Sequence, residues 1–498
     1  MVILPARMFV DISGIVHLLL VACLWFSTAT AQCVYKGCFC GCDTIYCEDM
    51  FLTSVPQITN STGGCMYMPQ LSLDRNQVTR ISTGSLIANL SGLSAANNPL
   101  ETIDDEAFAE SSNTLQSLVF SGATFTQLPT AVLRLRALTS LSMSNINITV
   151  WNDSAMVLLG SGIQSLTLDR VGLTAWPSWL HAYVRLFQLT VSGSSISSIP
   201  DDAFNTIANR LTELNLSNNN LTAVPKAMSN LTHLMKLSLA NNRITDITWL
   251  PQLSKLTSLS LNNNQISDSA KLSASLLYYA TTLSEFTIHN NILTSLPDVS
   301  FLTLMTTLDF THNHISDSNS GSVSSALIIL KLDSNHLTTI PVVLKTIRAQ
   351  YVILHLSYNS ITTVQGIDFP TSTSGVDLGG NLIQELNDTS FPYNSSIVYL
   401  YLYSNPLTIV SPLAFQNLPR LRELNLRSTS LSRLPLAIAS LKGLWSIDVT
   451  GSTRLVCTCE EKSLETIIRA AFDVFGDCGP TSLYNFFNNF SPTCPSKR

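Results

Sequence analysis

Tyrosine, histidine and acidic side chains recur in small groups between residues 285 and 427, and their chemistry suits non-covalent binding. Tyrosine offers a large amphipathic contact and is enriched at interface hot spots, while histidine and carboxylate groups add directional hydrogen bonds. The competing interpretation is that aromatic and polar residues are favoured on any sheet face. The groups are Glu285, Thr287 and His289; Asp309, Thr311 and His312; Lys331 and Asp333; His355 and Tyr358; Asp377; Tyr399, Tyr401 and Tyr403; and Glu423, Asn425 and Arg427.

Catalytic motifs are absent from the sequence. It contains no Gly-x-Ser-x-Gly elbow, no phosphate-binding loop and no His-Glu-x-x-His helix. Scattered serine, histidine and aspartate residues on a repeating scaffold do not make a catalytic triad, because a triad needs three groups that converge on a rigid site. We therefore predict that the chain is not an enzyme and requires no cofactor.

A histidine-rich stretch, His312-Asn313-His314, invites a metal-binding interpretation, and His336 lies one copy of the repeating pattern beyond His314. The alternative is that these histidines are exposed turn residues. No third ligand is found at coordination spacing, so the sequence predicts no metal site here.

A sequence repeat begins at Met68, and its period sets the spacing of these groups along the chain. Its clearest copy is Leu211-Thr-Glu-Leu214-Asn-Leu216-Ser-Asn-Asn219, and successive copies begin 22 to 27 residues apart. A fixed period indicates a stacked array. In each copy apolar and polar residues alternate, so a short strand points the apolar ones inward. The 17 copies begin at Met68, Leu90, Leu115, Leu138, Ile163, Leu186, Leu211, Leu234, Leu256, Leu283, Met305, Leu327, Tyr351, Thr373, Ile397, Leu421 and Leu444.

An asparagine follows the strand in most copies, at the point where the chain turns. A buried amide there can bond otherwise unpaired backbone groups, each bond contributing about 1 kcal/mol net. Copies three to six carry Ala123, Ile146, Val171 and Ser194 instead, so we expect that stretch to be less regular. The asparagines are Asn76, Asn98, Asn219, Asn242, Asn264, Asn291, Asn313, Asn335, Asn359, Asn381 and Asn405.

The repeat resembles that of the leucine-rich repeat (LRR) family over residues 68–452. The resemblance implies an α/β solenoid, an LRR horseshoe with a parallel β-sheet on the concave face and irregular, short-helical crossovers on the convex face. Five copies also place a phenylalanine five residues after the last apolar position, similar to the phenylalanine spine of extracellular members. These residues are Phe108, Phe204, Phe369, Phe391 and Phe415.

The N-terminal residues have the pattern of a secretory signal. Arg7 precedes an apolar run over residues 12–26, and Ala29-Thr-Ala31 stands before Gln32. An uncleaved membrane anchor is the alternative, although the apolar run is short for a bilayer span. We expect an exported, soluble chain with a signal peptide at residues 1–31, a cysteine-rich N-terminal cap at 32–67, the repeat array at 68–452 and a cysteine-rich C-terminal cap at 453–498.

Cysteines lie outside the array, six before it and four after it, apart from Cys23 in the signal. In an oxidising compartment this distribution indicates disulfide caps that shield the apolar ends of a solenoid. The N-terminal group is similar to the cap of the LRR family and implies Cys33–Cys40 and Cys38–Cys47, with Cys42–Cys65 paired by elimination. The C-terminal group is likewise similar to the family's cap and implies Cys457–Cys478 and Cys459–Cys494.

Charge is sparse, at 12% of residues, and the formal net charge is −6, which excludes a basic nucleic-acid-binding surface. Asn-x-Ser/Thr acceptors for N-linked glycans are frequent instead. A glycan on Asn215, between two strand leucines, would obstruct the concave face. The acceptors are Asn60, Asn89, Asn147, Asn152, Asn215, Asn220, Asn230, Asn387, Asn394 and Asn489.

A ligand is expected on the concave sheet, which is the extended binding surface of solenoids. The side chains at outward strand positions are mostly small in the first half of the array, and from the tenth copy on they differ in size and charge. No glycan acceptor lies between Asn230 and Asn387, which leaves this half bare, although chance spacing would do the same. Its acids favour a basic or hydrogen-bonding partner, and its histidines would make binding depend on pH below about 6.5.

The leading hypothesis is a secreted recognition protein that binds another protein, a peptide or an oligosaccharide on its concave face. Three alternatives stay open. The chain could be the ligand-binding ectodomain of a cell-surface receptor, or a structural matrix or wall component whose adhesion comes from a neutral Ser/Thr-rich surface. It could also inhibit a secreted hydrolase, since polygalacturonase-inhibiting proteins are similar in architecture.

Overall fold

The structure is a computed structural model that describes residues 33–59 and 68–494. It divides into two compact units, the first ending at Trp151 and the second beginning at Asn152. The expected signal peptide, the glycan acceptor Asn60 and the expected disulfide partner Cys65 lie outside the described residues. No described helix combines the length and the apolar character needed to cross a membrane.

The first unit is built on a sheet of short parallel strands. An antiparallel pair opens it, formed by β1 (Phe39–Cys40) and β2 (Thr44–Tyr46), and β2 then pairs in parallel with the first strand of the array. The N-terminal cap therefore contributes a rung to the sheet. The following parallel strands are β3 (Gln70–Ser72), β5 (Gly92–Ala95), β7 (Ser117–Ser121) and β8 (Ser140–Ser144), while β4 (Arg80–Ile81) and β6 (Thr102–Ile103) form a separate parallel pair.

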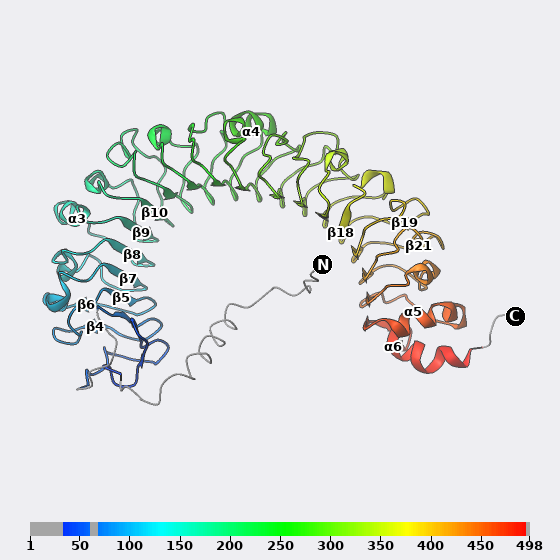
Figure 1. Ribbon diagram of the computed structural model, residues 1–498, viewed down its shortest axis with the longest axis horizontal. Coiled ribbons are helices and arrows are strands. Elements are labelled where there is room, and N and C mark those ends of the chain that lie inside the picture. The colour runs from blue at the N-terminus through cyan, green and yellow to red at the C-terminus, as the bar shows by residue number, and fades with distance from the viewer. Residues whose placement is uncertain (1–32, 60–67, 495–498) are drawn as a thin grey trace. The chain divides into compact units, whose positions relative to one another are not determined.

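The second unit continues the same pattern through a longer run of parallel strands, which lie along the inner side of a curve with the helices on the outer side (Figure 1). Each strand pairs with the next one along the chain, apart from the outer strands β19 (Glu385–Leu386) and β21 (Ile409–Val410), which pair with each other. The inner strands are β9 (Ser165–Asp169), β10 (Gln188–Ser192), β11 (Glu213–Asn215), β12 (Lys236–Ser238), β13 (Ser258–Ser260), β14 (Glu285–Thr287), β15 (Thr307–Asp309), β16 (Ile329–Lys331), β17 (Val352–His355), β18 (Thr373–Asp377), β20 (Tyr399–Tyr401), β22 (Glu423–Asn425), β23 (Ser446–Asp448) and β24 (Asp473–Phe475).

Repeat leucines stack in register between neighbouring rungs. Leu214 pairs with Leu237, and Leu237 pairs with Leu259, and each is 2% exposed or less. Alternation along the strand turns these side chains inward, and stacking of the rungs covers them. The parallel LRR sheet expected from the sequence is confirmed.

Ladder asparagines are buried in every repeat that carries one. Asn264 is typical: its amide nitrogen donates to the carbonyl oxygens of Leu239 and Leu261, at 3.0 Å each, and its Oδ1 accepts from the backbone nitrogen of Ile244 at 3.0 Å. One side chain thus satisfies backbone groups of two adjacent turns. The same pattern recurs through Asn405.

The expectation that copies three to six would be less regular is wrong. These copies form β7, β8, β9 and β10, which are five residues long, whereas β11–β16 have three residues each. Within each unit the long strands pair over their full length. In the other copies the side-chain nitrogen of the asparagine donates to the backbone carbonyl oxygen of the second strand leucine, as Asn219 does to Leu216. That carbonyl no longer pairs with the neighbouring strand, so strand pairing ends earlier.

Crossovers between strands are short helical turns or irregular segments. Several begin directly after a proline, at Pro129, Pro177, Pro225, Pro341 and Pro435, whose fixed φ suits the start of a helical turn. The crossover helices are η2 (Ala109–Ser111), α2 (Thr130–Leu133), α3 (Asp153–Gly160), η3 (Ser178–Ala182), η4 (Lys226–Asn230), α4 (Ser269–Leu276), η5 (Leu277–Tyr279), η6 (Val342–Thr346), η7 (Gly366–Asp368) and η8 (Leu436–Ser440).

The phenylalanines of the expected spine are all buried between crossovers, from Phe415 at 0% exposure to Phe369 at 5%. The rings of Phe391 and Phe415 lie 6.2 Å apart on neighbouring repeats. They fill the outer half of the core, where the repeat leucines do not reach.

Four disulfides close the described ends, and they are the pairs implied by the family's caps: Cys33–Cys40, Cys38–Cys47, Cys457–Cys478 and Cys459–Cys494. Cys42 is exposed. The C-terminal cap adds β24 as a last rung and covers it with η9 (Cys459–Leu464), α5 (Glu465–Ala470), a β-hairpin of β25 (Asp477–Cys478) and β26 (Thr481–Ser482), α6 (Leu483–Asn485), η10 (Phe486–Phe490) and η11 (Ser491–Thr493).

Candidate ligand-binding face

The outward side chains of β14–β22 line up in columns because the strands are parallel and in register. The central column follows the pairings Thr287–Asp309, Asp309–Lys331, Lys331–His355, His355–Asp377, Asp377–Tyr401 and Tyr401–Asn425. A second column holds Tyr399 and Glu423, which are also partners. Residues two positions after the central column form a third, with His289, Thr311, Asp333, Ser357, Gly379, Tyr403 and Arg427. We call the residues of these three columns between 285 and 427 the varied face.

Two of the predicted binding residues lie in turns, outside the three columns. His312 and Tyr358 occupy the turn before the ladder asparagine, with φ of 54° and 53°, and both are exposed. Other repeats place Asn241, Asn263 or Ser334 in this left-handed conformation, which asparagine tolerates better than most residues. His312 and Tyr358 therefore sit at the rim of the varied face, whereas the other predicted residues lie on or just after its strands.

Negative charge predominates on the varied face. Its carboxylates are Glu285, Asp309, Asp333, Asp377 and Glu423, and its fixed cations are Lys331 and Arg427. Lys331 is already engaged, because its Nζ lies 3.5 Å from Asp309 Oδ2. The face therefore offers more carboxylate than it neutralises, which suits a basic or hydrogen-bond-donating partner.

Two tyrosines are held by carboxylates. The Tyr401 hydroxyl donates to Glu423 Oε1 at 3.2 Å, and the Tyr403 hydroxyl donates to Asp377 Oδ2 at 3.3 Å. Burial, and then the neighbouring negative charge, raises the pKa of both hydroxyls, so both remain protonated donors. Tyr358 packs edge-on against Tyr403 at 6.2 Å between ring centres and fixes the ring from the rim.

Tyr403 reaches Asp377 on the neighbouring rung because Gly379, two residues after Asp377 on the same rung, has no side chain. A Cβ at Gly379 would lie 2.1 Å from Tyr403 Cζ, so only a residue without a side chain leaves room for the ring. The Tyr403 ring thereby covers Gly379, the third-column residue of that rung, and lies beside Asp377.

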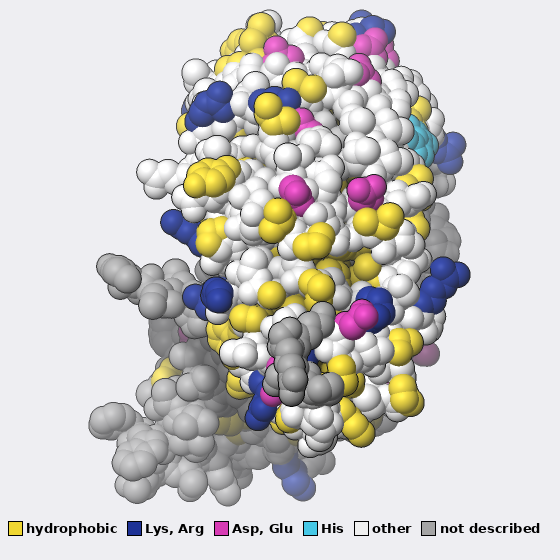
Figure 2. All heavy atoms as spheres, turned by 90° about the vertical axis from the view of Figure 1, so that its right-hand side faces the viewer, with side chains coloured by type: hydrophobic (Ala, Val, Ile, Leu, Met, Phe, Trp, Pro, Cys, Tyr) yellow, Lys and Arg dark blue, Asp and Glu magenta, His cyan; other side chains and the backbone are white. Residues whose placement is uncertain are grey.

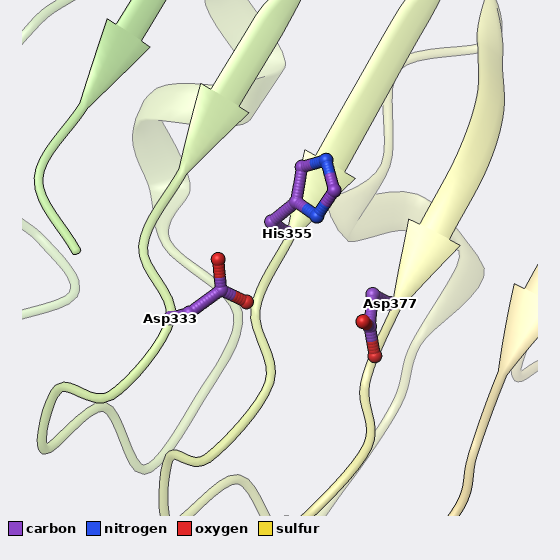
Figure 3. A group of neighbouring side chains, drawn as sticks. All are labelled: Asp333, His355 and Asp377. Carbon is purple, nitrogen blue, oxygen red and sulfur yellow. The ribbon is translucent and has the colours of Figure 1, made fainter. Parts of the chain in front are cut away.

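Three metal-ligand side chains converge on the varied face, although the sequence analysis did not group them. Asp333, His355 and Asp377 each place one ligand atom within 4.8 Å of the others, and Figure 3 shows them on neighbouring rungs. They lie 22 residues apart in the sequence, and that spacing was the signal that could have identified them. Burial, followed by the charge of Asp333, raises the pKa of the Asp377 carboxyl.

The histidines that first suggested a metal site form only a pair. His314 Nδ1 lies 3.1 Å from His336 Nε2, and both residues are exposed beyond the ladder asparagines. Among the described residues no carboxylate or thiol joins them within coordination distance. This arrangement agrees with exposed turn residues.

The glycan acceptors within the described residues are all exposed or half-buried. Asn215 lies on β11 and lines a hollow of about 270 Å³ over β10–β13, on the N-terminal side of the varied face. The bare interval between Asn230 and Asn387 spans β12–β18 and hence most of the varied face.

Apolar side chains also remain on the surface near the C-terminal cap. Phe472 is 79% exposed and packs edge-on against Trp445, which is 56% exposed. Figure 2, which looks at the right-hand side of Figure 1, shows apolar side chains scattered between charged ones. They form no continuous groove comparable to the varied face.

Sequence comparison with known families matches models described as leucine-rich repeats, at residues 184–244, 209–266 and 371–431 for one and 301–318 for another. A curated relative, the leucine-rich repeat-containing G-protein coupled receptor 5 of Rattus norvegicus, is 32% identical over 103 residues. That match covers 21% of this chain and 11% of the receptor's length.

Structural comparison finds similar solenoids at low sequence identity, so the likeness concerns the fold alone. A chain in a crystal structure of a TLR13–ssRNA13 complex matches with a TM-score of 0.55 and 20% identity, over 81% of this chain and 70% of that one. An LRR protein of Leptospira interrogans matches with a TM-score of 0.53 and 20% identity, over 86% and 94%. One from Bacteroides thetaiotaomicron matches with a TM-score of 0.51 and 15% identity, over 77% and 52%.

Proposed function

We propose that this chain, which is a leucine-rich repeat protein with disulfide pairs near both ends of its described part, is an exported recognition protein that holds another macromolecule on its varied face. The observation that carries the proposal is the change of side chains along one sheet. Outward positions are small and neutral at Thr167, Thr190 and Ser238, but tyrosines, histidines and acids fill the same columns on β14–β22.

The size of the varied face limits the ligand. Seven rungs at about 4.8 Å give roughly 29 Å of groove, which suits a protein patch, a peptide or an oligosaccharide better than a small metabolite. The excess of carboxylates favours a ligand with basic or hydrogen-bond-donating groups. Tyr399, Tyr401 and Tyr403 supply the large contacts on which such interfaces depend.

Export is the second part of the proposal. Disulfides persist in oxidising compartments, and four of them close the described ends. The signal-like residues 1–31 and the abundant glycan acceptors support the same route.

A glycan placed inside the varied face tests the proposal. Asp309→Asn creates an N-glycan acceptor, because Phe310 and Thr311 follow it, and it keeps an oxygen that can accept from the Thr311 backbone nitrogen. Expressed in glycosylating cells, this variant should lose partners that the wild-type protein retains in a pull-down from its native medium.

The matched control is Asp309→Asn combined with Thr311→Ala, which removes the same charge but creates no acceptor. It should retain partners far better than the glycosylated single variant. A second control, Asn215→Gln, removes an acceptor from β11, outside the varied face, and should leave binding unchanged. Equal retention by the glycosylated variant and the wild-type protein would contradict the assignment of the varied face.

A ligand-binding ectodomain of a cell-surface receptor is the second candidate function. The observation that favours it is the match to the rat receptor, 32% identical over 103 residues. A varied face would serve either protein in the same way, and the two functions differ in whether the chain is released from the membrane.

A further inference from the structure

Asp333, His355 and Asp377 come from three consecutive rungs of one sheet. His355 ends β17 and Asp377 ends β18, and the two are register partners. Asp333 lies two residues beyond Lys331, the end of β16, which is the register partner of His355. The alternation of a strand turns all three side chains to the same side of the sheet, as Figure 3 shows.

The three side chains face one another without bonding to one another. Their ligand atoms are no more than 4.8 Å apart, yet no hydrogen bond or ion pair joins any two of them. Two metal–ligand bonds of about 2.1 Å span at most about 4.2 Å, so small side-chain rotations bring all three atoms to coordination distance. The gap has the width of a bridging cation.

The carboxylates of Asp333 and Asp377 are not neutralised by a lysine or arginine of the described residues. Among the described residues, no lysine or arginine pairs with Asp333 or Asp377, because the neighbouring Lys331 is bound to Asp309. Both carboxylates are half-buried, where an uncompensated pair of charges is more costly than in open solvent. A cation between them would remove this repulsion.

Surrounding groups orient the carboxylates and leave donor atoms open. Asp333 Oδ1 accepts from the backbone nitrogen and the hydroxyl of Ser357, at 2.9 and 2.6 Å. Asp377 Oδ1 accepts from the Gly379 backbone nitrogen at 2.9 Å, and its Oδ2 accepts from Tyr403. Within the described part of the chain, Asp333 Oδ2 and both ring nitrogens of His355 have no hydrogen-bond partner. Outer hydrogen bonds of this kind position metal ligands.

We propose that Asp333, His355 and Asp377 bind a divalent transition-metal cation on the varied face. One imidazole and two carboxylates are a nitrogen–oxygen donor set that suits Zn²⁺ or Mn²⁺, whereas Ca²⁺ prefers six to eight oxygen ligands. Three protein ligands leave at least one coordination position open. The inference goes beyond the proposed recognition function and does not depend on it.

Metal binding is tested by calorimetric titration of Zn²⁺, and separately Mn²⁺, into the full chain after treatment with a chelator. We expect one ion per chain at this site, with affinity at least about tenfold weaker in His355→Ala and in Asp377→Asn. Asp377→Asn keeps an oxygen for the Gly379 backbone nitrogen, and circular dichroism verifies that both variants fold.

His336→Ala is the matched control, because it removes a histidine from the exposed His314–His336 pair, the other candidate for binding Zn²⁺. It should leave the affinity of the site unchanged. The proposal is overturned if the wild-type protein binds neither ion at millimolar concentration, or if His355→Ala and Asp377→Asn bind as tightly as the wild-type protein. Neither outcome would affect the result of the glycan test, which concerns the recognition function alone.

Discussion

Each ladder asparagine contributes more to the stability of the fold than a polar surface residue does, because it joins the turns of two repeats. Asn264 makes three buried backbone bonds through one short side chain, and it is 7% exposed. Where the strand ends before these groups, as β13 does at Ser260, an aliphatic side chain at that point would leave two carbonyls and one amide nitrogen without partners.

We predict that Asn264→Ala lowers the free energy of unfolding by about 3 kcal/mol, because buried groups left unpaired cost about 1 kcal/mol or more each. Urea unfolding followed by circular dichroism measures the loss. Gln265→Ala, at the exposed neighbouring position, should change stability by less than about 0.5 kcal/mol. Similar losses in both variants would mean that the ladder bonds contribute little.

Which side chains meet on the varied face could be predicted only in part. Thr287, Asp309 and Lys331 were placed on one face from leucine alternation, and the register agrees. The convergence of Asp333 on His355 was not predicted, because Asp333 lies two residues past the end of β16, in the third column, whereas His355 belongs to the central column. Side-chain reach across rungs depends on such local offsets, which the repeat period does not specify.

At the scale of elements, strand length was the main error of sequence reasoning. Loss of the asparagine at Ala123 and Val171 was expected to weaken order, but it freed carbonyls for continued strand pairing. The strand leucines, in contrast, follow from the repeat spacing, because a stacked array must bury them. The four described cap disulfides are the pairs that the family resemblance implied.

The C-terminal cap is joined to the last repeat by an ion pair between the half-exposed Arg433 and the buried Glu461. Arg433 Nε donates to Glu461 Oε1 at 2.6 Å, and the Thr458 backbone nitrogen donates to Glu461 Oε2 at 2.8 Å. Glu461 is only 1% exposed and closes a capping box with Thr458 at the start of η9. Burial alone would raise the pKa of this carboxyl, but the bonds from Arg433 and Thr458 outweigh it and hold the pKa below its ordinary value.

We predict that the cap loses stability in acid. Because the folded pKa of Glu461 lies below its unfolded value, its contribution is complete above the unfolded value and is lost as the pH falls through the folded one. The protection of residues 458–470 against hydrogen exchange, relative to the intrinsic exchange rate at each pH, should therefore fall between pH 6 and pH 3. In Glu461→Gln the same change of pH should lower protection less. An identical loss of protection in both proteins would rule out Glu461 as the cause.

At the scale of the whole molecule, the decisive question is whether the chain leaves the cell. We predict that the mature protein is found in the medium, free of membrane, and begins at Gln32, because residues 1–31 have the features of a cleaved signal. Fractionation of an expressing culture and N-terminal sequencing of the product give the answer. Recovery only with the membrane fraction would support the receptor ectodomain.

One consequence of the asparagine ladder is mechanical. In the second unit, every amide from Asn219 to Asn405 is bonded to the turn before its own, so no rung there can peel away without breaking bonds to its neighbour. A chain pulled from its ends would therefore yield rung by rung, as a sequence of similar force peaks. The varied face would open only after the terminal rungs had done so.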